Sequence, residues 1–259
     1  MQQTDHTPAI DRMHLVEGLG KGLRVIEAFS DEFPRLTVTV AAERTGLTRY
    51  AVRRYLLSLV HFGYAATDGK HYWLLPKVLR LGQAFMEGAR VPRLVQPFIQ
   101  RASIQCGETL NVSALDGHEI VYLSRSNAAR GASIGFHQGA RVPAHVVAPG
   151  LAILSTLDDA ALDDWIAGHS FASFTGFTLV EPQAFRDSVV LARRLGYWQA
   201  DQYINFGLCG LSVPLKDRRG RCEYGVSVTV QRLAYPDDQM VTRLLPVLQE
   251  VAETLRPII

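Results

Sequence analysis

The chain has 259 residues, of which 47% are hydrophobic and 20% are charged, and its net charge at pH 7 is +2. This length and composition are typical of a soluble globular protein with two domains of ordinary size or one large domain. No run approaches the roughly 18 apolar residues that a membrane helix requires, and the first 13 residues lack the apolar core of a signal peptide. We therefore expect a cytoplasmic protein without a membrane partner.

Cysteine and histidine usage argues against a metal site. Cys106, Cys209 and Cys222 are widely spaced and form no CxxC pair, so neither a disulfide framework nor a thiolate cage is predicted. The eight histidines show no HExxH or close HxH spacing. We expect no metal and no cofactor.

The N-terminal part predicts a small helical domain. Residues 1–13 are polar and show no period, so we expect a mobile tail. Apolar residues then recur on one helical face over residues 19–29. A second helix, capped by Thr37 or Thr39, closes at Gly46, where a tight turn leads into a third helix.

The stretch 48–62 has the layout of a helix that lies in the major groove of DNA. Its apolar residues share one face at helical spacing, and Thr48 can cap its start. The other face carries Arg49, Tyr50, Arg53 and Arg54. Because arginine to guanine is the commonest base-specific contact, we expect these residues to reach base edges or phosphates.

A two-stranded wing is predicted directly after this helix, with strands at 64–67 and 71–75 around the turn 68–70. Lys70 and His71, together with Thr48, are expected to hold the DNA backbone. For His71 an ordinary strand position is an equal alternative.

Basic residues are concentrated in the same part of the chain. Between Arg44 and Arg80, seven Lys and Arg residues accompany a single acid, Asp68, whereas the whole chain carries only +2. A basic segment on a near-neutral protein is typical of DNA binding, because phosphate contacts release counterions from the duplex. The alternative is a solvated helical hairpin that its arginines merely keep soluble.

After the wing, the pattern predicts a linker helix that starts at Pro76 and a longer helix over residues 92–106. From Thr109 the period changes to that of strands. Runs at 110–115 and 119–124 flank Asp116-Gly117, which is a strong hairpin signal.

The rest of the chain alternates helices and strands. Further strands are predicted at 133–136, 210–215 and 224–230, and helices at 149–157, 158–168, 182–196 and from Pro236 onward. Strands at both ends with helices between them predict an α+β domain in which helices pack on a mainly antiparallel sheet.

The order and spacing of these landmarks resemble the IclR family of bacterial transcriptional regulators over residues 16–256. The blocks that carry the resemblance include GLTRYAVRRYLLSLVHFGY at 46–64, LPKVLRLG at 75–82, VPAH at 142–145 and VPL at 213–215. The first two blocks are closest to the branch that regulates catabolism of protocatechuate and 4-hydroxybenzoate.

The resemblance implies an N-terminal winged helix-turn-helix, a linker helix and a C-terminal GAF-like effector-binding domain. The expected boundaries are 1–13 for the tail, 14–76 for the DNA-binding domain, 77–90 for the linker and 91–259 for the effector domain. It implies a homodimer or dimer of dimers that binds operator DNA and a small aromatic acid, with RNA polymerase as a further partner. We expect 4-hydroxybenzoate as effector ahead of protocatechuate, and activation ahead of repression.

The resemblance also assigns an effector cavity with mostly apolar walls. Its implied lining residues are Ile134, Val142, Ala148, Pro149, Asp201, Leu208, Gly210, Ser227 and Thr229. The chain departs from the family pattern at Ala200-Asp201, Cys209-Gly210 and Gly150-Leu151, and each departure removes bulk or charge. The room left suits an aromatic ring better than a two-carbon acid.

A carboxylate in such a cavity needs hydrogen-bond donors, because charge-assisted hydrogen bonds are the strong ones. The candidate donors are Ser227, Thr229, Arg125, His137, Arg141 and His145. For the two histidines an ordinary structural role is the better interpretation, and Tyr122 and Tyr203 are as readily packing residues as partners of a ring hydroxyl.

An enzyme is the main competing class, and the sequence argues against it. No GxSxG motif frames a serine, and neither Cys106 nor Cys209 has a histidine that the sequence pairs with it. Two further hypotheses remain open. One is a repressor that responds to another small organic acid, and the second is a DNA-binding protein whose C-terminal half only oligomerises.

Overall fold

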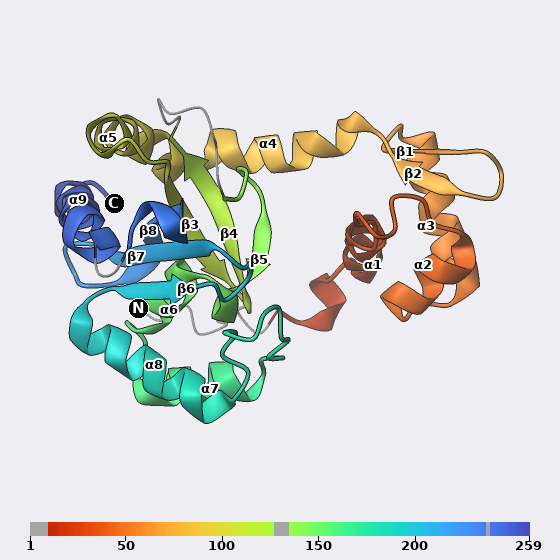
Figure 1. Ribbon diagram of the computed structural model, residues 1–259. Helices are drawn as coiled ribbons and strands as arrows, with labels where there is room; N and C mark the ends of the chain where they lie inside the picture. The colour runs from red at the N-terminus through yellow and green to blue at the C-terminus, as the bar shows by residue number, and fades with distance from the viewer. Residues whose placement is uncertain (1–9, 127–134, 237–238) are drawn as a thin grey trace. The chain divides into compact units, whose positions relative to one another are not determined.

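The computed structural model describes residues 10–126, 135–236 and 239–259, so most of the predicted tail lies outside the described residues. The contacts within the chain define two compact units, residues 2–88 and 89–259 (Figure 1). Within the described ranges, no helix has both the length and the apolar character that a membrane span requires.

The smaller unit contains the predicted helices and wing. Its elements are η1 (Arg12–His14), α1 (Glu17–Glu27), α2 (Val38–Thr45), α3 (Arg49–His61), β1 (Ala65–Thr67), β2 (Tyr72–Leu74), η2 (Pro76–Val78) and α4 (Leu79–Gly88). The predicted caps are confirmed, since Thr37 Oγ1 accepts the Val40 N–H and Thr48 Oγ1 accepts the Ala51 N–H. Gly46 adopts φ 67°, a left-handed conformation that only glycine adopts without strain, and so allows the tight turn between α2 and α3.

A small apolar core holds these helices together. Val25 of α1, Val52 and Leu56 of α3, and Leu36 ahead of α2 are all fully buried, and Tyr72 of β2 closes the cluster. Burial of each such side chain contributes about 1.5–3 kcal/mol. The orientation of α3 is therefore set by the helical spacing of its apolar residues, which leaves the opposite face in solvent.

The larger unit is built on one sheet. Its elements are α5 (Arg90–Cys106), β3 (Leu110–Asp116), β4 (Glu119–Arg125), β5 (Arg141–Pro143), η3 (Ala144–Val146), α6 (Ala148–Leu154), α7 (Asp159–Ala167), α8 (Pro182–Leu195), β6 (Trp198–Asp201), β7 (Leu208–Lys216), β8 (Cys222–Gln231), η4 (Arg232–Ala234) and α9 (Gln239–Leu255). The strand order is β5-β4-β3-β8-β7-β6, and every neighbouring pair is antiparallel, which confirms the predicted sheet type.

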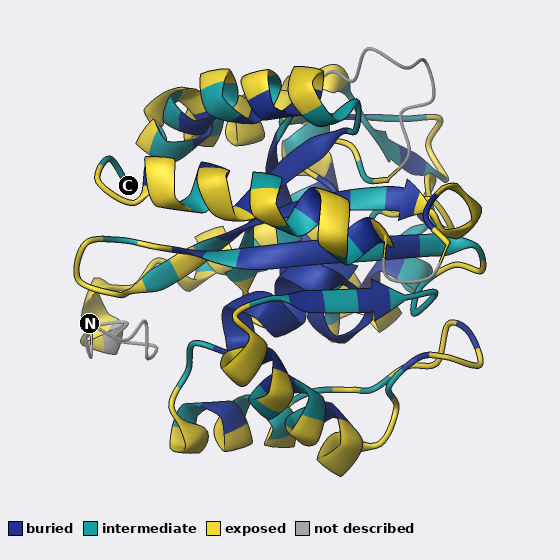
Figure 2. Ribbon diagram, turned by 60° about the vertical axis from the view of Figure 1, so that its left-hand side comes forward, coloured by how far each residue is buried: buried dark blue, intermediate teal, exposed yellow. Residues whose placement is uncertain are grey.

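Helices cover both faces of this sheet (Figure 1). Helices α5 and α9 pack on one face through Val95, Ile99, Leu244 and Leu248, and α6 packs on the other face with α7 and α8 outside it. Figure 2 shows buried strands in the middle and exposed outer faces on the helices. The side chains of each strand alternate between the two layers, because successive residues point to opposite faces.

The structure differs from the sequence-based elements in a few places. The edge strand β6 was not predicted, because its four residues, Trp198–Asp201, alternate too briefly to stand out after the helix that ends at Gly196. The predicted strand 133–136 lies partly outside the described residues, and Gly135 and Phe136 are not in a strand. The helix predicted from residue 92 begins earlier, at Arg90, because Pro92 lies in its first turn, where its missing N–H costs nothing.

Helix α6 packs very close to the preceding residue Ala144 and to the sheet, because glycines occupy the points of contact. A Cβ on Gly150 would lie 1.8 Å from the Ala144 carbonyl oxygen. Across the interface with the sheet, a Cβ on Gly210 would lie 3.3 Å from the Ala148 Cβ, and one on Gly225 would lie 3.4 Å from Ile153 Cγ1. All seven residues of α6 are buried, so this helix has no room to move away.

Replacement of Gly150 by alanine should therefore destabilise the larger unit. The new methyl group collides with backbone rather than with a flexible side chain, so we expect a loss of roughly 3 kcal/mol in the free energy of unfolding. Chemical denaturation of Gly150→Ala and wild type measures this. Gly176→Ala is the matched control, because a Cβ there meets nothing within 4 Å. Equal stability of Gly150→Ala and wild type would contradict the close approach of α6.

Candidate functional site

The face of α3 that points away from the core forms a basic surface. Its solvent-exposed residues are Thr48, Arg49, Tyr50, Arg53 and Arg54. Tyr50 is 74% exposed, and the Arg54 guanidinium lies 5.9 Å from the centre of its ring. An exposed helix face with three arginines and an aromatic ring provides both phosphate contacts and bidentate donors for guanine.

The wing adds further cations. Lys70 is exposed at its tip, where Asp68 Oδ1 accepts the backbone N–H groups of Lys70 and His71. The His71 Nδ1 lies 3.3 Å from Asp68 Oδ2, so this ring takes part in the turn itself. The sequence-based interpretation missed Arg35, whose guanidinium lies 4.5 Å from the centre of the Trp73 ring on β2.

Two of the basic residues counted in this segment have structural roles. Arg44 donates from Nε to the Ala28 carbonyl at 2.7 Å and lies over the Phe33 ring. Lys77 donates to the Phe62 carbonyl at 2.7 Å and lies over Tyr64. Both cations therefore connect neighbouring elements of the smaller unit, and the arginines of α3 and Lys70 of the wing remain as the candidate DNA-contacting cations.

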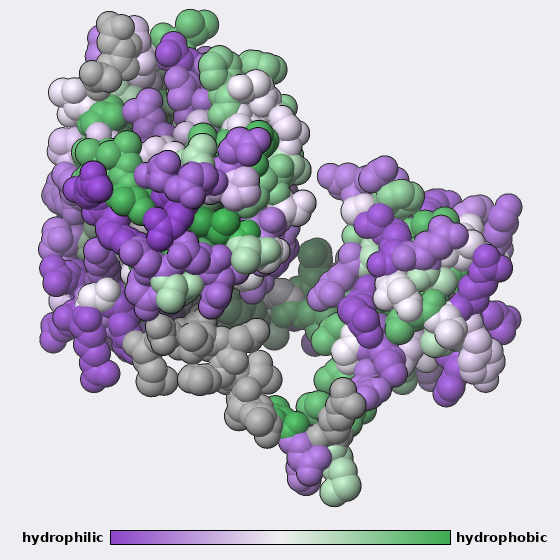
Figure 3. All heavy atoms as spheres, turned by 90° about the horizontal axis from the view of Figure 1, so that it is seen from below, coloured by the Kyte–Doolittle hydropathy of each residue, from purple (hydrophilic) through white to green (hydrophobic). Residues whose placement is uncertain are grey.

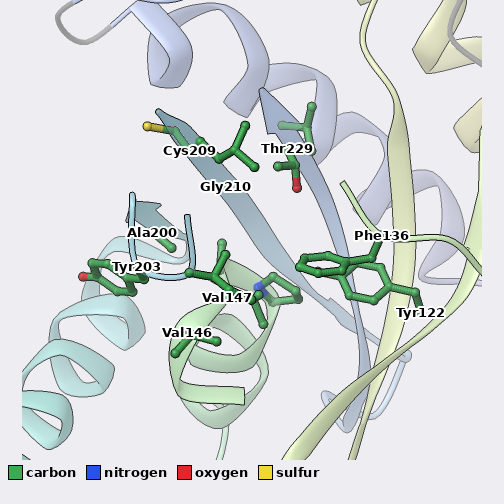
Figure 4. A pocket seen from close by; sticks show the side chains of 14 residues that line it. Tyr122, Phe136, Val146, Val147, Ala200, Tyr203, Cys209, Gly210 and Thr229 are labelled. Atoms are coloured by element: carbon green, nitrogen blue, oxygen red, sulfur yellow. The ribbon is translucent and has the colours of Figure 1, made fainter. Parts of the chain in front are cut away.

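The larger unit contains a cavity between the sheet and the N-terminal end of α6 (Figure 4). The space between its walls is about 340 Å³, which includes the solvent at its open mouth. The lining residues are Tyr122, Phe136, Val146, Val147, Ala148, Pro149, Ala200, Tyr203, Ile204, Leu208, Cys209, Gly210, Val228 and Thr229. Most of these side chains are apolar, so the walls suit a flat hydrophobic group.

Two aromatic rings form one end of the cavity. The rings of Tyr122 and Phe136 lie 5.0 Å apart at 31°, and Figure 4 shows them side by side below Thr229. Arg125 Nη1 donates to the Phe136 carbonyl, which places a guanidinium beside this end. Burial raises the pKa of Tyr122 well above its usual range, so its hydroxyl stays protonated.

A loop outside the sheet holds the opposite wall, which carries Tyr203 and Ile204. Thr175 Oγ1 donates to the Gln202 carbonyl at 2.7 Å, and Thr178 Oγ1 donates to the Tyr203 carbonyl at 2.6 Å. Gln202 adopts φ 62°, which non-glycine residues rarely do, and its side chain accepts the Gly207 N–H. The two threonine hydroxyls therefore fasten this turn to the loop.

Five of the positions assigned to the cavity from sequence do line it: Ala148, Pro149, Leu208, Gly210 and Thr229. Val142 does not, because it pairs with Ile120 on β4 and packs into the core beside it. Asp201 does not either, because its carboxylate accepts from Arg232 and from the Cys209 thiol. Ser227 is buried beneath the cavity without being part of its wall, and Ile134 lies outside the described residues.

Two proposed donors for a carboxylate have other partners. Arg141 is paired with both Asp116 and Glu119 at 2.7 Å. His145 is fully buried, and its Nε2 lies 2.9 Å from the Ala172 carbonyl, as expected for a structural histidine. Phe136, Val146, Val147 and Ile204 were not predicted as wall residues. Val146 and Val147 could have been predicted as wall residues, because they directly precede the assigned wall residues Ala148 and Pro149.

A chain of histidines lies behind the cavity wall. His169 Nε2 lies 2.8 Å from His145 Nδ1, and the His169 ring stacks on Trp165 at 4.4 Å. Burial, together with the neighbouring His145 and His118, lowers the pKa of His169 to about 4. Burial likewise lowers the pKa of His145. Among the described residues, no three His, Cys, Asp or Glu side chains come together in a way that could hold a metal ion.

Comparison with known proteins identifies both domains. A family model for the IclR helix-turn-helix domain matches residues 18–69, and one for the bacterial transcriptional regulator IclR C-terminal domain matches residues 83–256. The chain belongs to the IclR family of transcriptional regulators. It is thus a regulator with a DNA-binding helix-turn-helix and not an enzyme.

Relatives of this regulator include proteins named for aromatic catabolism. The p-hydroxybenzoate hydroxylase transcriptional activator of Acinetobacter baylyi is 31% identical over 94% of this chain and 92% of its own length. The Pca regulon regulatory protein of Pseudomonas putida is 32% identical over 92% of this chain and 82% of its own length. Among solved structures, a double mutant of the PobR inducer-binding domain from Acinetobacter, in complex with 3-hydroxybenzoic acid, matches with a TM-score of 0.62 and 25% identity, over 66% of this chain and 100% of that one.

Replacement of Arg53 by alanine should weaken operator binding without a change in stability, because Arg53 is exposed and its side chain lies outside the core. Loss of one arginine contact to a base costs about 1–3 kcal/mol. Gel retardation on the operator measures the affinity. Arg24→Ala, which removes an exposed arginine from α1, is the control and should bind normally. Normal retardation by Arg53→Ala would remove this residue from the DNA-contacting set.

The histidine chain should make stability depend on pH. Because the pKa of His169 is about 4 in the folded state and near 6.5 in the unfolded chain, the unfolded state binds more protons between these values. The contribution of His169 to the free energy of unfolding is therefore fully present above pH 6.5 and is lost as the pH falls toward 4. Denaturant unfolding at several pH values measures this, and His169→Gln should flatten the profile, whereas the exposed His61→Gln should not. An unchanged profile in His169→Gln would contradict this assignment.

Proposed function

We propose that this protein activates transcription of genes for aromatic-acid catabolism in response to a hydroxybenzoate. The observation that supports this best is the lining of the cavity, which has the Tyr122 and Phe136 rings at one end and mostly aliphatic side chains elsewhere. The relative named as an activator of p-hydroxybenzoate hydroxylase aligns over nearly the whole chain. We therefore rank 4-hydroxybenzoate first and protocatechuate second, and the protein requires no other cofactor.

The small residues around the cavity favour a ring over a two-carbon acid. Ala148, Ala200 and Gly210 line the cavity and contribute little side-chain bulk to its wall. Tight contact of apolar walls with a flat ring is the main source of affinity for such ligands, and a few polar groups fix orientation.

We further propose that the protein binds DNA as a homodimer, which can pair into a dimer of dimers. Helices α1 and α4 both leave large apolar side chains in solvent, among them Leu19 at 66%, Leu79 at 74% and Phe85 at 54% exposure. Figure 3 shows hydrophobic side chains between hydrophilic ones on the visible face of the smaller unit. Exposed apolar faces of this kind are typical of interaction surfaces. RNA polymerase is the further partner that activation requires.

Calorimetric titration with 4-hydroxybenzoate, protocatechuate, benzoate and β-ketoadipate tests the effector class. We expect the two hydroxylated rings to bind and the ring-free β-ketoadipate to bind much more weakly. Because a ligand of the folded state stabilises it, 4-hydroxybenzoate at 100 times its Kd should add about 2.7 kcal/mol to the free energy of unfolding.

Thr229→Leu is the matched variant for this titration. Thr229 lines the cavity, so the larger leucine side chain should fill part of it and weaken binding of the rings, while operator binding is retained. A wild-type protein that binds none of the four acids, or equal binding by Thr229→Leu, would contradict the proposed effector site. A reporter gene that falls rather than rises on addition of 4-hydroxybenzoate would contradict activation.

A further inference from the structure

Three polar side chains on strands β3 and β8 are buried without a partner among the described residues. Asn111 is 1% exposed, and neither its Nδ2 nor its Oδ1 makes a hydrogen bond within the described part of the chain. The same holds for Ser113 Oγ and Ser227 Oγ, whose residues are 0% and 1% exposed. All three residues lie just outside the cavity wall that the described residues form.

The strand register brings these three side chains together. Asn111 of β3 pairs with Ser227 of β8, and Ser113 lies two residues further along β3, so all three point to the same face. This is the face that packs on α6, because Leu110 and Val112 on the other face belong to the core under α5 and α9.

The polar group lies between known cavity residues. Ser113 pairs with Tyr122 across β3 and β4, and Ser227 lies two residues from Thr229 on the same face of β8. Both Tyr122 and Thr229 line the cavity. We call Asn111, Ser113 and Ser227 the polar floor, since they lie on the sheet between the wall residues Tyr122 and Thr229.

Such a floor is unfavourable in an empty apolar interior. A buried amide or hydroxyl without a partner loses its hydration and gains nothing in return, so nearly all such groups in native proteins have partners. A neighbouring serine on the same sheet follows this rule: Ser212 Oγ, adjacent to Ser227 in register, donates to the Val226 carbonyl at 3.0 Å. The floor departs from this rule, as do the buried ring nitrogens His118 Nδ1, His169 Nδ1 and Trp198 Nε1 among the described residues, but only in the floor do three such residues lie together on the sheet.

We infer that the polar floor binds the carboxylate of the effector and that Asn111 is the residue that orients it. This inference rests on the proposed function, because it takes the ligand to be an aromatic acid. The Asn111 Nδ2 and the two serine hydroxyls are donors, and a carboxylate accepts about four hydrogen bonds. The Asn111 Oδ1 can accept from one of the hydroxyls.

The charged residues near the polar floor favour binding of an anion there. Arg125 is the direct partner of Asn111 on β4. Its guanidinium lies near Thr229, because a Cβ on Gly135 would come within 3.7 Å of Arg125 Nη1 and 3.5 Å of Thr229 Oγ1. No Asp or Glu belongs to the cavity wall that the described residues form. A carboxylate on the floor thus lies close to a cation, with the ring between the apolar walls.

Asn111→Leu tests this assignment by calorimetry with 4-hydroxybenzoate. We expect the affinity to fall about 10- to 100-fold, as for the loss of a hydrogen bond to a charged group. The melting temperature of the unliganded variant should stay equal or rise, because a buried unpaired amide has been removed. Ser227→Ala, which removes one oxygen and cannot overfill the site, should show the same pattern with a smaller loss of affinity.

Ser212→Ala is the matched control, because its hydroxyl already has a partner. It should lower the melting temperature without ligand and leave the affinity unchanged. The methyl ester of 4-hydroxybenzoate tests the chemistry, since it keeps the ring and hydroxyl but removes the charge. The wild type should bind the ester at least about tenfold more weakly, and Asn111→Leu should discriminate less between acid and ester.

The outcomes separate the two proposals. Equal affinity of Asn111→Leu and Ser227→Ala with wild type, or a large fall in the melting temperature of both without ligand, would show that the floor is structural and overturn the inference. Equal binding of acid and ester would overturn the assignment of the carboxylate. A wild type that binds no aromatic acid, measured first, would instead overturn the proposed effector class.

Discussion

The close approach of α6 to the sheet is the constraint on which the larger unit depends. Gly150 allows the helix to pass within contact of the Ala144 carbonyl, and Gly210 and Gly225 let it lie against β7 and β8. A short helix that is buried on every side cannot shift to absorb extra volume, since protein interiors are closely packed. The space left at the N-terminal end of α6 is therefore a fixed feature of the fold.

The loop between α7 and α8 couples the two walls of that space. His145, which lies directly before the wall residue Val146, is bonded to this loop through Ala172 and His169. The same loop holds the opposite wall through Thr175 and Thr178. Protonation of His145 would remove the acceptor that its Nδ1 offers to His169 and would keep the bond to the Ala172 carbonyl, so low pH weakens the first connection only in part.

Much of the architecture follows from local patterns. The helices, their caps and the hairpin at Asp116-Gly117 depend on residues a few positions apart, so the sequence alone predicts them. The missed strand β6 has only four residues and gains its structure from pairing with β7, which is a tertiary interaction. The role of a charged side chain is equally hard to predict from sequence. Arg44 and Lys77 lie in a basic segment that suggests phosphate contacts, whereas in the structure both donate to backbone carbonyls.

Periodicity, caps and turn residues act over short distances, so the amino-acid pattern was enough to predict the order of domains, the mainly antiparallel sheet and the exposed basic side of α3. The content of the cavity follows from tertiary contacts. Residues as far apart as Asn111 and Ser227 meet through strand register, and Val142 and Asp201 are drawn into other contacts. Whether a buried polar group has a hydrogen-bond partner depends on all the elements packed around it, so a local sequence pattern cannot predict it.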